Sequence, residues 1–380
     1  MSQDSQPSRS PESVTLAVDV MGADGGLDAT VGGCARARAN GLRARLRLYG
    51  REDEVRATVE RHALTNAEVV HADDVIAMDD KPTRAMRRRG SSMWNAIHAV
   101  KAGEAQGAVS SGNTGALMAM SVLQLRMIEG ADRPAITASW PTRRGRTVVL
   151  DVGANVEATP AQLVQFAIMG EAYYAALTGK EHPSVGLLNV GEEEAKGHEV
   201  IREAAQILRD ADPDMDFRGF VEGDDISAGA VDVVVTDGFT GNIALKAAEG
   251  TARMIGGWIK DALTRNAMSK AGALLLAPSL RNLKARMDPS EMNGAPLLGL
   301  TGLVVKSHGG ADAAGVAAAL CTTENLATHP FQEQIRQTIA AVEARRRAAG
   351  EDEAATMTEA GAEPETDSGA EPARAEGAAE

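Results

Sequence analysis

The chain has 380 residues, 44% of them apolar and only 3% aromatic, so alanine, valine and leucine must fill most of its core. Its net charge of −14 and lack of interleaved aromatics argue against nucleic acid as a partner, and no basic-then-apolar leader begins the chain. Cys34 and Cys321 form no C-x-x-C pair, which argues against a disulfide framework or a thiol zinc site. We therefore expect a cytoplasmic protein.

Composition predicts disorder at both ends of the chain. Residues 1–12 are polar, and residues 346–380 form an acidic tail in which positions 351–380 hold ten acids and one arginine. Such segments bury too little apolar surface to offset the entropy of ordering. A single α/β domain over residues 13–345 is predicted between them.

Along that domain, short apolar runs alternate with helical stretches at 159–178, 196–210 and 241–263. The runs are apolar nearly throughout, which is typical of strands buried on both faces. Strand–helix alternation of this kind predicts a mostly parallel, doubly wound sheet between helical layers. The predicted strands lie at residues 15–20, 46–50, 67–72, 107–112, 147–153, 184–191, 231–238 and 302–309.

Polar residues and glycine end six of these runs. In open α/β sheets ligands bind beyond the carboxyl ends of the strands, and the helix that follows presents free N–H groups to an anion. We expect all six turns on one sheet edge, where they would form a polar crevice for a small anion. They are Asp19, Ser110–Asn113, Asp151–Asn155, Asn189–Glu192, Asp237–Asn242 and Lys306–His308.

Two of these turns share a pattern in which asparagine, threonine and glycine precede a helix. They read "SSGNTGAL" at 110–117 and "TDGFTGN" at 236–242. Helix capping explains each of them as well as anion binding does, and both roles can coexist. The candidate residues are Gly112, Asn113, Thr114 and Gly115 in the first turn, and Thr240, Gly241 and Asn242 in the second.

Signatures of the common cofactors are missing from the sequence. No two glycines stand two positions apart, which excludes G-x-G-x-x-G, and no glycine pair four positions apart has serine at its centre, which excludes G-x-S-x-G. The only Gly-Lys pair is followed by Glu181 rather than Ser or Thr. The seven histidines form no H-x-x-x-H pair. We therefore expect neither a cofactor nor a metal.

Several blocks of the sequence resemble the phosphate acyltransferase family of bacterial phospholipid synthesis, also called acyl-acyl carrier protein:phosphate transacylases. The blocks include "LAVDVMGADGG", "RAMRRRGSSM", "SSGNTGALMAM", "LLNVGEEEAKG", "DGFTGNIALK" and "MNGAPLLGLTGLVVKSHG", in family order between about Thr15 and Val342. The resemblance implies a Rossmann-like α/β/α fold, related to phosphotransacetylases and isocitrate dehydrogenases, and a homodimer. It also implies that inorganic phosphate attacks the thioester of a long-chain acyl-acyl carrier protein, giving acyl phosphate.

With this resemblance, the polar turns become candidate site residues. Lys196 and Lys306 or His308 would supply positive charge, and Asp237 would orient one of them or a water. Each of these residues also has a structural interpretation. Lys196 could be a surface charge paired with the neighbouring glutamates, Asp237 could cap the following helix, and His308 could be a buried core histidine. Catalytic candidates are Lys196, Asp237, Asn242 and His308; substrate-binding candidates are Asp19, Arg88, Gly112, Asn113, Thr114, Gly115, Asn155, Thr240, Gly241 and Lys306.

A basic run, "KPTRAMRRRGSSM" at 81–93, stands out in this acidic chain. Acyl carrier proteins are strongly acidic, so the run is a candidate docking surface, and Arg88 is a candidate for the phosphate instead. The alternative is a solvated surface run without a partner. The five bases are Lys81, Arg84, Arg87, Arg88 and Arg89.

Residues 253–287 combine apolar side chains at helical spacing with flanking bases. A helical hairpin is predicted around 253–290, and residues 270–287 are predicted to touch a membrane surface; a dimer interface is the alternative. In the family the next enzyme is a membrane-bound glycerol-3-phosphate acyltransferase, the expected downstream partner. Two other functions stay open: a phosphotransacetylase acting on a coenzyme A thioester, and a non-enzymatic scaffold for acyl carrier protein.

Overall fold

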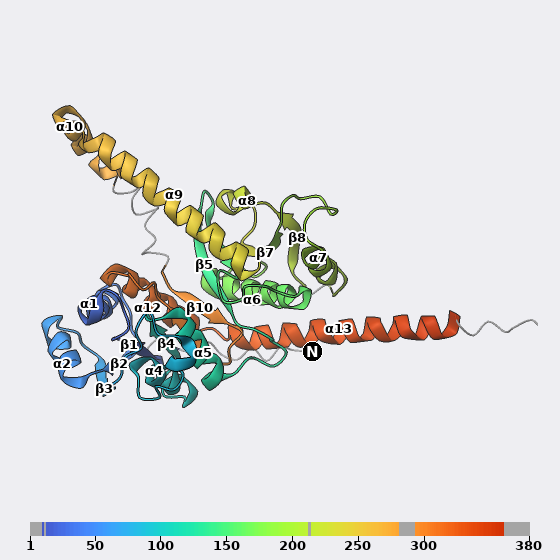
Figure 1. Ribbon diagram of the computed structural model, residues 1–380, viewed down its shortest axis with the longest axis horizontal. Coiled ribbons are helices and arrows are strands. Elements are labelled where there is room, and N and C mark those ends of the chain that lie inside the picture. Colours follow the sequence, from blue (N-terminus) through green and yellow to red (C-terminus); the bar gives the residue numbers. More distant parts are fainter. Residues whose placement is uncertain (1–9, 11–12, 212–213, 281–292, 361–380) are drawn as a thin grey trace, which may run out of the picture.

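A computed structural model describes residue 10 and residues 13–211, 214–280 and 293–360 (Figure 1). Its centre is a sheet of eleven strands in the order β3-β2-β1-β4-β11-β10-β5-β6-β9-β7-β8. The strands are β1 (Thr15–Asp19), β2 (Arg45–Gly50), β3 (Ala67–His71), β4 (Gly107–Ser110), β5 (Ala135–Thr142), β6 (Gly145–Leu150), β7 (Ser184–Leu188), β8 (Asp216–Val221), β9 (Val233–Val235), β10 (Ala295–Leu298) and β11 (Leu303–Lys306).

Helices cover both faces of this sheet and bury a separate apolar core on each. One core packs side chains of α1, α6, α7, α12 and α13 against the sheet, and the other packs those of α3, α4, α5 and α8. The three-layer α/β/α fold is therefore confirmed. The helices are α1 (Gly26–Ala39), α2 (Glu52–Arg61), α3 (Pro82–Ala85), α4 (Ser92–Lys101), α5 (Thr114–Leu125), α6 (Pro160–Thr178), α7 (Glu199–Ala211), α8 (Gly223–Ala228), α9 (Gly238–Thr264), α10 (Ala267–Leu275), α12 (Ala313–Ala327) and α13 (Phe331–Ala360).

All eight predicted strands are present, but β5, β8 and β10 were not predicted. β5 and β8 mix buried with partly exposed positions, so they lack the continuous apolar run of the others. β10 has only four residues and contains Pro296. Two of these strands, β5 and β10, decide how the sheet is assembled.

The sheet consists of two parallel halves that run in opposite senses. Strands β3, β2, β1, β4 and β11 are parallel, and so are β6, β9, β7 and β8. Between the halves, the pairs β11–β10, β10–β5 and β5–β6 are all antiparallel. Because three reversals invert the strand sense, β6 runs opposite to β11.

The prediction that all six polar turns share one sheet edge is therefore wrong. The turns after β1, β4 and β11 belong to one half, and those after β6, β7 and β9 belong to the other. Sheet twist moderates this opposition, since the three strand steps from β11 to β6 at about 20–25° each give roughly 60–75°. The carboxyl ends of the two halves thus point in different directions that are not strictly opposite.

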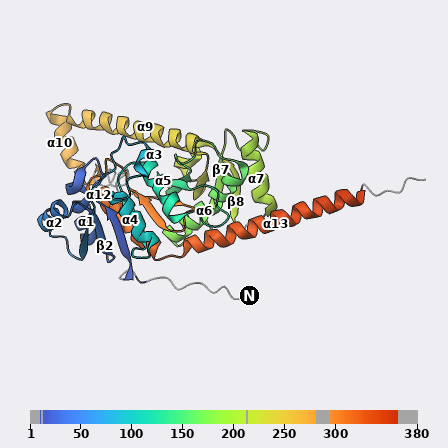
Figure 2. The same cartoon turned by 60° about the horizontal axis from the view of Figure 1, so that its bottom comes forward.

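Helices α9 and α10 form an arm that projects from this body (Figures 1 and 2). In α9 only Gly238 and Gly241, in its first turn, are buried, and α10 has no buried residue. The predicted hairpin at 253–290 is thus helical through α10, while its segment 281–290 lies outside the described residues. Among the described helices, none is long and apolar enough to cross a membrane.

Helix α13 continues past position 345, where the sequence predicts the ordered domain to end. The tail was predicted to be disordered from residue 346, whereas the helix runs to Ala360 and extends away from the body (Figure 2). The alanine, glutamate and arginine residues at 346–360 have high helix propensity. Residues 361–380, like 1–9, 11 and 12 at the other end, lie outside the described residues.

Candidate functional site

The polar turns form two clusters, one in each half of the sheet. The Lys306 cluster comprises Asp19, Ser110–Gly115 and Lys306–His308, after strands β1, β4 and β11. The Lys196 cluster comprises Asp151–Asn155, Asn189–Lys196 and Asp237–Asn242, after strands β6, β7 and β9. Each half brings together turns that are distant in sequence, and no hydrogen bond or ion pair of the described side chains joins one cluster to the other.

Lys306, the last residue of β11, is a buried amine. Its side chain is 8% exposed, and its Nζ donates to the carbonyl oxygens of Ser111 (3.4 Å) and Ser307. Burial lowers the pKa of Lys306 to about 8, against the opposing pull of the Asp24 and Asp19 carboxylates. An amine in this setting gains from a nearby anion, because its charge lacks a direct ion pair.

Asp19, at the end of β1, is buried beside the turn after β4. The Ser110 hydroxyl donates to its Oδ2 (2.7 Å), and the Met21 N–H donates to its Oδ1 (3.3 Å). Burial raises the pKa of Asp19, against the hydrogen bond from Ser110. Gly22 allows this close approach, since a Cβ there would lie 3.0 Å from the Gly112 Cα.

Asn113 caps α5 and also holds a neighbouring segment. Its Oδ1 accepts the Ala116 N–H (2.9 Å), while its Nδ2 donates to the carbonyls of Met78 (2.8 Å) and Asp80 (3.0 Å). Both ends of the amide are therefore used inside the protein. Thr114, the next residue, is exposed and its hydroxyl has no partner among the described residues.

Two other predicted residues of this half lie at its margin. His308 is exposed rather than a core histidine; its backbone N–H donates to Asn293 Oδ1 (3.0 Å), and its ring Nδ1 accepts the Gly310 N–H (3.2 Å). Arg88 points inward, where it donates to the Val75 carbonyl (2.6 Å) and pairs with Asp80 (3.2 Å). Asn293 was missed by the sequence reasoning, because no apolar run or glycine turn marks it.

The Lys196 cluster is organised by Asp151, at the end of β6. Asp151 is fully buried, and its carboxylate accepts backbone N–H groups of Ile136, Gly153, Ala154 and Asn155 at 2.7 to 3.2 Å. The Asn155 Nδ2 donates to the same carboxylate (2.9 Å). Burial raises the pKa of Asp151 against these donors. This carboxylate fixes the turn, a role that the sequence pattern did not single out.

The second glycine turn begins α9 and packs onto Asp151. Asp237 is the N-cap of α9, accepting the Thr240 N–H and the Thr240 hydroxyl, each at 2.8 Å. A Cβ at Gly241 would lie 2.0 Å from the Asp151 carbonyl oxygen, so only glycine fits there. Asn242 is exposed and lies against Gly153. The capping alternative for Asp237 is thus the one that the geometry supports.

Lys196 lies in an exposed loop, unlike Lys306. Its Nζ pairs with Glu193 Oε2 (2.7 Å), and this hydrogen bond raises the pKa of Lys196 above its ordinary value. Buried Asn189 holds the loop closed, because its Nδ2 donates to the carbonyls of Gly191 and Lys196, each at 3.1 Å. A surface cavity of about 500 Å³ is lined by Glu192, Glu193, Lys196 and Glu222.

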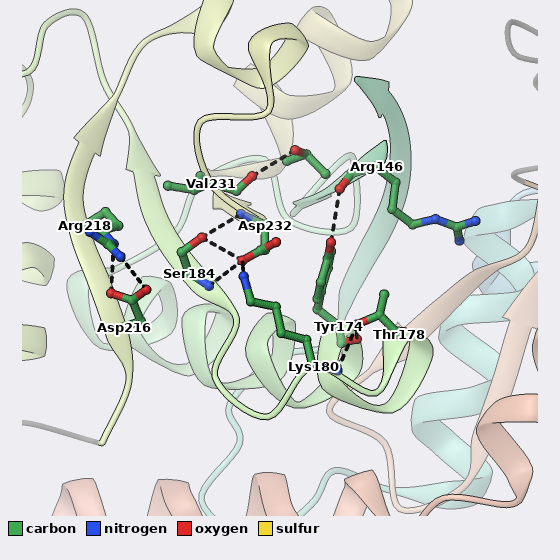
Figure 3. Close-up of polar contacts among 10 residues, drawn as sticks. Arg146, Tyr174, Thr178, Lys180, Ser184, Asp216, Arg218, Val231 and Asp232 are labelled. Atoms are coloured by element: carbon green, nitrogen blue, oxygen red, sulfur yellow. Dashed lines mark hydrogen bonds and ion pairs between the residues drawn. The ribbon is translucent and has the colours of Figure 1, made fainter. Parts of the chain in front are cut away.

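A larger cavity, of about 650 Å³, lies near the amino-terminal ends of β7 and β8. Figure 3 shows polar contacts there: Lys180 Nζ and the Ser184 hydroxyl both donate to Asp232, at 2.6 and 2.7 Å. Arg218 pairs with Asp216. Glu192 and Glu194 of the Lys196 cluster line one side of this cavity, but none of the catalytic or substrate-binding candidates does. Most of the charges in the cavity are already paired, so we do not place the site there.

Metal ligands do not cluster in either place. Within the described ranges, no group of three or more histidine, cysteine, aspartate or glutamate side chains is arranged to hold a metal ion.

Comparisons with known proteins agree on one family. Residues 14–334 match a family model described as "Fatty acid synthesis protein". A relative from Maricaulis maris, named phosphate acyltransferase, is 55% identical over 328 residues, 85% of this chain and 93% of the relative. A second, from Caulobacter vibrioides and of the same name, is 54% identical over 327 residues, 85% of this chain and 91% of the relative.

Solved structures share the fold at low sequence identity. A phosphotransacetylase from Streptococcus pyogenes has a TM-score of 0.57 and 18% identity, covering 83% of this chain and 94% of that one. The EutD phosphotransacetylase from Staphylococcus aureus has a TM-score of 0.56 and 16% identity, covering 84% and 95%. At these identities the likeness concerns the fold alone, and it fits the predicted phosphotransacetylase-like architecture.

Proposed function

The chain belongs to the fatty acid synthesis protein family, among its phosphate acyltransferases, and we propose that it converts long-chain acyl-acyl carrier protein and inorganic phosphate to acyl phosphate and free carrier protein. The protein is thus a transferase of acyl groups to phosphate. The single observation that carries the site assignment is the buried, unpaired amine of Lys306 beside the first turn of α5.

In the proposed reaction a phosphate oxygen attacks the thioester carbonyl carbon directly. A C–O bond forms, the C–S bond breaks, and the carrier thiolate leaves and takes up a proton. Phosphate near neutral pH is already an anion, so positioning and charge stabilisation matter more than a general base. Held geometry of this kind contributes roughly 7–11 kcal/mol in intramolecular reactions.

Phosphate binding is assigned to the Lys306 cluster. The amine of Lys306 supplies positive charge, and the exposed Thr114 with the first N–H groups of α5 supplies donors. Gly112 and Gly115 let the anion approach the backbone. Asp19 and Asn113 act as positioning residues, because their polar atoms are already bonded within the protein. His308 borders the same turn.

The Lys196 cluster is assigned to the thioester carbonyl on the second rim. Lys196 and Asn242 are both exposed there, and the first turn of α9 adds donors for a developing oxyanion. Thr240 and Gly241 shape that turn, while Asn155 is held by Asp151. In this scheme Asp237 positions Thr240 as the helix cap.

A covalent acyl-enzyme is disfavoured by the state of both cysteines. Burial raises the pKa of the Cys34 thiol to about 12. Burial and the nearby Glu324 carboxylate also raise the pKa of Cys321. A nucleophilic cysteine needs a lowered pKa, so neither thiol is activated. This supports direct attack by phosphate.

The α9–α10 arm is proposed to contact the membrane. Leu274 and Leu275 are 78% and 84% exposed at its tip, and Trp258 is 62% exposed along α9. Exposed apolar side chains beside bases such as Lys270 fit shallow binding to anionic lipid. The basic part of this segment at 281–287 lies outside the described residues. The remaining apolar face of α9, which includes Ile255 and Ile259, is proposed as the interface of a homodimer.

A membrane position suits the product. A long-chain acyl phosphate has an apolar chain and a labile anhydride bond, so release near a membrane shortens its exposure to water. We propose a membrane-bound glycerol-3-phosphate acyltransferase as the enzyme that uses it. Flotation with anionic vesicles tests the contact: Leu275→Glu should float less than wild type, and equal flotation would remove the arm from this role.

One assay tests the function against its alternatives. The protein is incubated with phosphate and either palmitoyl-acyl carrier protein or acetyl-coenzyme A, and acyl phosphate and free thiol are measured. We expect turnover with the carrier substrate. Turnover with acetyl-coenzyme A alone would indicate a phosphotransacetylase, and carrier binding without turnover would indicate a scaffold.

A further inference from the structure

Residues 74–92 form a compact basic lobe that joins β3 to α4. A β-bridge pairs Asp74 with Ser91, and the Ser92 N–H donates to the Asp74 carbonyl (3.0 Å). Ile76 and Ala85 are buried in the core below, at 1% and 0% exposure. The lobe is thus closed on itself and anchored, rather than a loose surface loop.

The basic lobe is fastened to the Lys306 cluster at two points. Asn113, at the start of α5, donates to the Met78 and Asp80 carbonyls of the lobe. Met78 also lies against Gly309, two residues past Ser307, where a Cβ would be 2.9 Å from the Met78 Cε. The lobe therefore borders the proposed phosphate site.

The five bases of the lobe fall into two groups, those that contact other residues of the protein and those that are exposed without a partner among the described residues. The Arg88 guanidinium points into the lobe, where it donates to the Val75 carbonyl and the Asp80 carboxylate. The Arg89 guanidinium lies 5.7 Å from the ring centroid of Trp94. Arg84 and Arg87 are exposed, and neither guanidinium has a hydrogen bond or ion pair to any described residue. Exposed Lys81 lies one helical turn before Arg84.

The charge of this region contrasts with that of the whole chain. Residues 81–93 contain five bases and no acid, in a protein whose net charge is −14. Unneutralised basic side chains on an acidic protein repel most cations and attract an acidic partner locally. Because these bases lie beside the Lys306 cluster, an acidic partner bound to them would be next to the proposed phosphate site.

We propose that Lys81, Arg84 and Arg87 are the docking surface for the acidic carrier protein that delivers the acyl thioester. This rests on the proposed function, and it gives two further residues new roles. Arg88 and Asn113 are positioning residues, because they hold the lobe in shape and against α5. The carrier binds at the lobe, and its prosthetic arm reaches past the phosphate held at the Lys306 cluster to bring the thioester carbonyl to the Lys196 cluster.

The test measures binding of holo-acyl carrier protein, without an acyl group or turnover, to the full-length double variant Arg84→Glu/Arg87→Glu. We expect the Kd to rise at least tenfold at low salt, and the dependence of Kd on salt to become shallower than in wild type. In the acyl phosphate assay the variant should raise KM for acyl carrier protein, with kcat at saturation within threefold.

The matched control is Arg36→Glu/Lys101→Glu, with the same charge change. Both residues are exposed near the ends of α1 and α4, which lead into the amino-terminal ends of β2 and β4, away from the Lys306 cluster. We expect the control to bind within twofold of wild type. Wild-type affinity for acyl carrier protein in the lobe variant, or an equal loss of affinity in both variants, would overturn the proposal that the lobe is the docking surface.

Because the binding measurement needs no reaction, its outcome is separate from that of the proposed function. Loss of binding only in the lobe variant supports docking even if acyl phosphate is never formed. Matching thermal unfolding of the two variants and wild type establishes that the change is at the surface.

Discussion

Lys306 ends strand β11 and Lys196 lies in the loop after β7, each near a glycine-containing turn, yet their surroundings differ in burial, partners and pKa. Lys306 is buried, has only carbonyl oxygens as direct partners, and has a pKa lowered to about 8. Lys196 is half exposed, paired with Glu193, and has a raised pKa. The difference shows that a lysine beside a glycine turn acquires its chemistry from burial.

Burial also determines how much each lysine gains from phosphate. Lys306 has lost its water and has no ion pair, so an incoming anion restores an interaction that the free protein lacks. Lys196 already has a carboxylate partner and solvent, and an exposed ion pair contributes little in either state. The first lysine is therefore suited to bind the anion, and the second to assist a charge that develops during reaction.

Replacing the two lysines separately should give the largest effect. Lys306→Met is expected to lower kcat/KM by about 10²–10³, mainly by raising KM for phosphate, because a preorganised charge is lost. Lys196→Met is expected to lower kcat by roughly tenfold, with KM for phosphate unchanged. Steady-state kinetics with varied phosphate measures both.

Circular dichroism and thermal unfolding serve as the folding control for these variants. A normal KM for phosphate in folded Lys306→Met would exclude the Lys306 cluster as the anion site. Near-normal turnover in Lys196→Met would remove the second rim from the mechanism and leave the first to act alone.

The second prediction concerns stability as a function of pH. The folded-state pKa of Lys306 is about 8 against an ordinary 10.5, so between these values the unfolded chain holds a proton that the folded protein lacks. The contribution of this residue to the free energy of unfolding should therefore rise by about 3 kcal/mol from pH 8 to 10.5.

The free energy of unfolding is measured against pH for wild type and for Lys306→Met, and the difference between the two curves isolates this rise. The subtraction is needed because the buried tyrosines and Cys34 also titrate at high pH. Burial raises the pKa of Tyr173 and Tyr174 to about 12, which acts in the opposite sense. Urea unfolding at a series of pH values gives both curves. Parallel curves from pH 8 to 10.5 would mean that Lys306 is hydrated.

Much of the fold could be predicted from the sequence, because most strands are recognisable from their own residues alone. Apolar β-branched runs such as 233–235 sit in parallel strands buried on both faces, so each run is readable without its neighbours. β10 and β5 are recognisable only by the strands they pair with. Because these two reverse the sense of the sheet, a single rim was expected where the protein has two.

The site residues show the same limit. The pattern located Asn113 and Asp237 in turns that precede helices, and both are indeed N-caps. It did not reveal that Asn113 also holds the basic lobe, or that buried Asp151 collects the N–H groups of its own turn. Such contacts depend on segments tens of residues apart, so they leave no periodic signal.

Glycines on α9 give the third prediction, because two of them sit in opposite environments. Gly241 packs against the Asp151 carbonyl, while Gly256 has open space where a Cβ would be. Gly241→Ala should destabilise the protein by about 1–3 kcal/mol and disrupt the Lys196 cluster. Gly256→Ala should stabilise it by about 0.5–1 kcal/mol, since alanine favours an exposed helix.

Chemical denaturation compares these two glycine variants, and kinetics follows the folded fractions. If the two variants had equal stability, the contact between α9 and the turn after β6 would be absent in solution. A stable Gly241→Ala with unchanged kcat would show that the second rim does not need this packing for activity.

The smallest expected effect separates the capping role of Asp237 from a catalytic one. Its two carboxylate oxygens accept the Thr240 N–H and the Thr240 hydroxyl, so the charge itself has no cationic partner among the described residues. Asparagine caps helices as well as aspartate, so Asp237→Asn should keep stability and keep kcat/KM within about twofold. Asp237→Ala loses the cap and should be less stable by about 1 kcal/mol. If Asp237→Asn instead folds normally but loses most of its kcat, the carboxylate charge acts in the reaction, and the second rim would need a charged partner that capping does not explain.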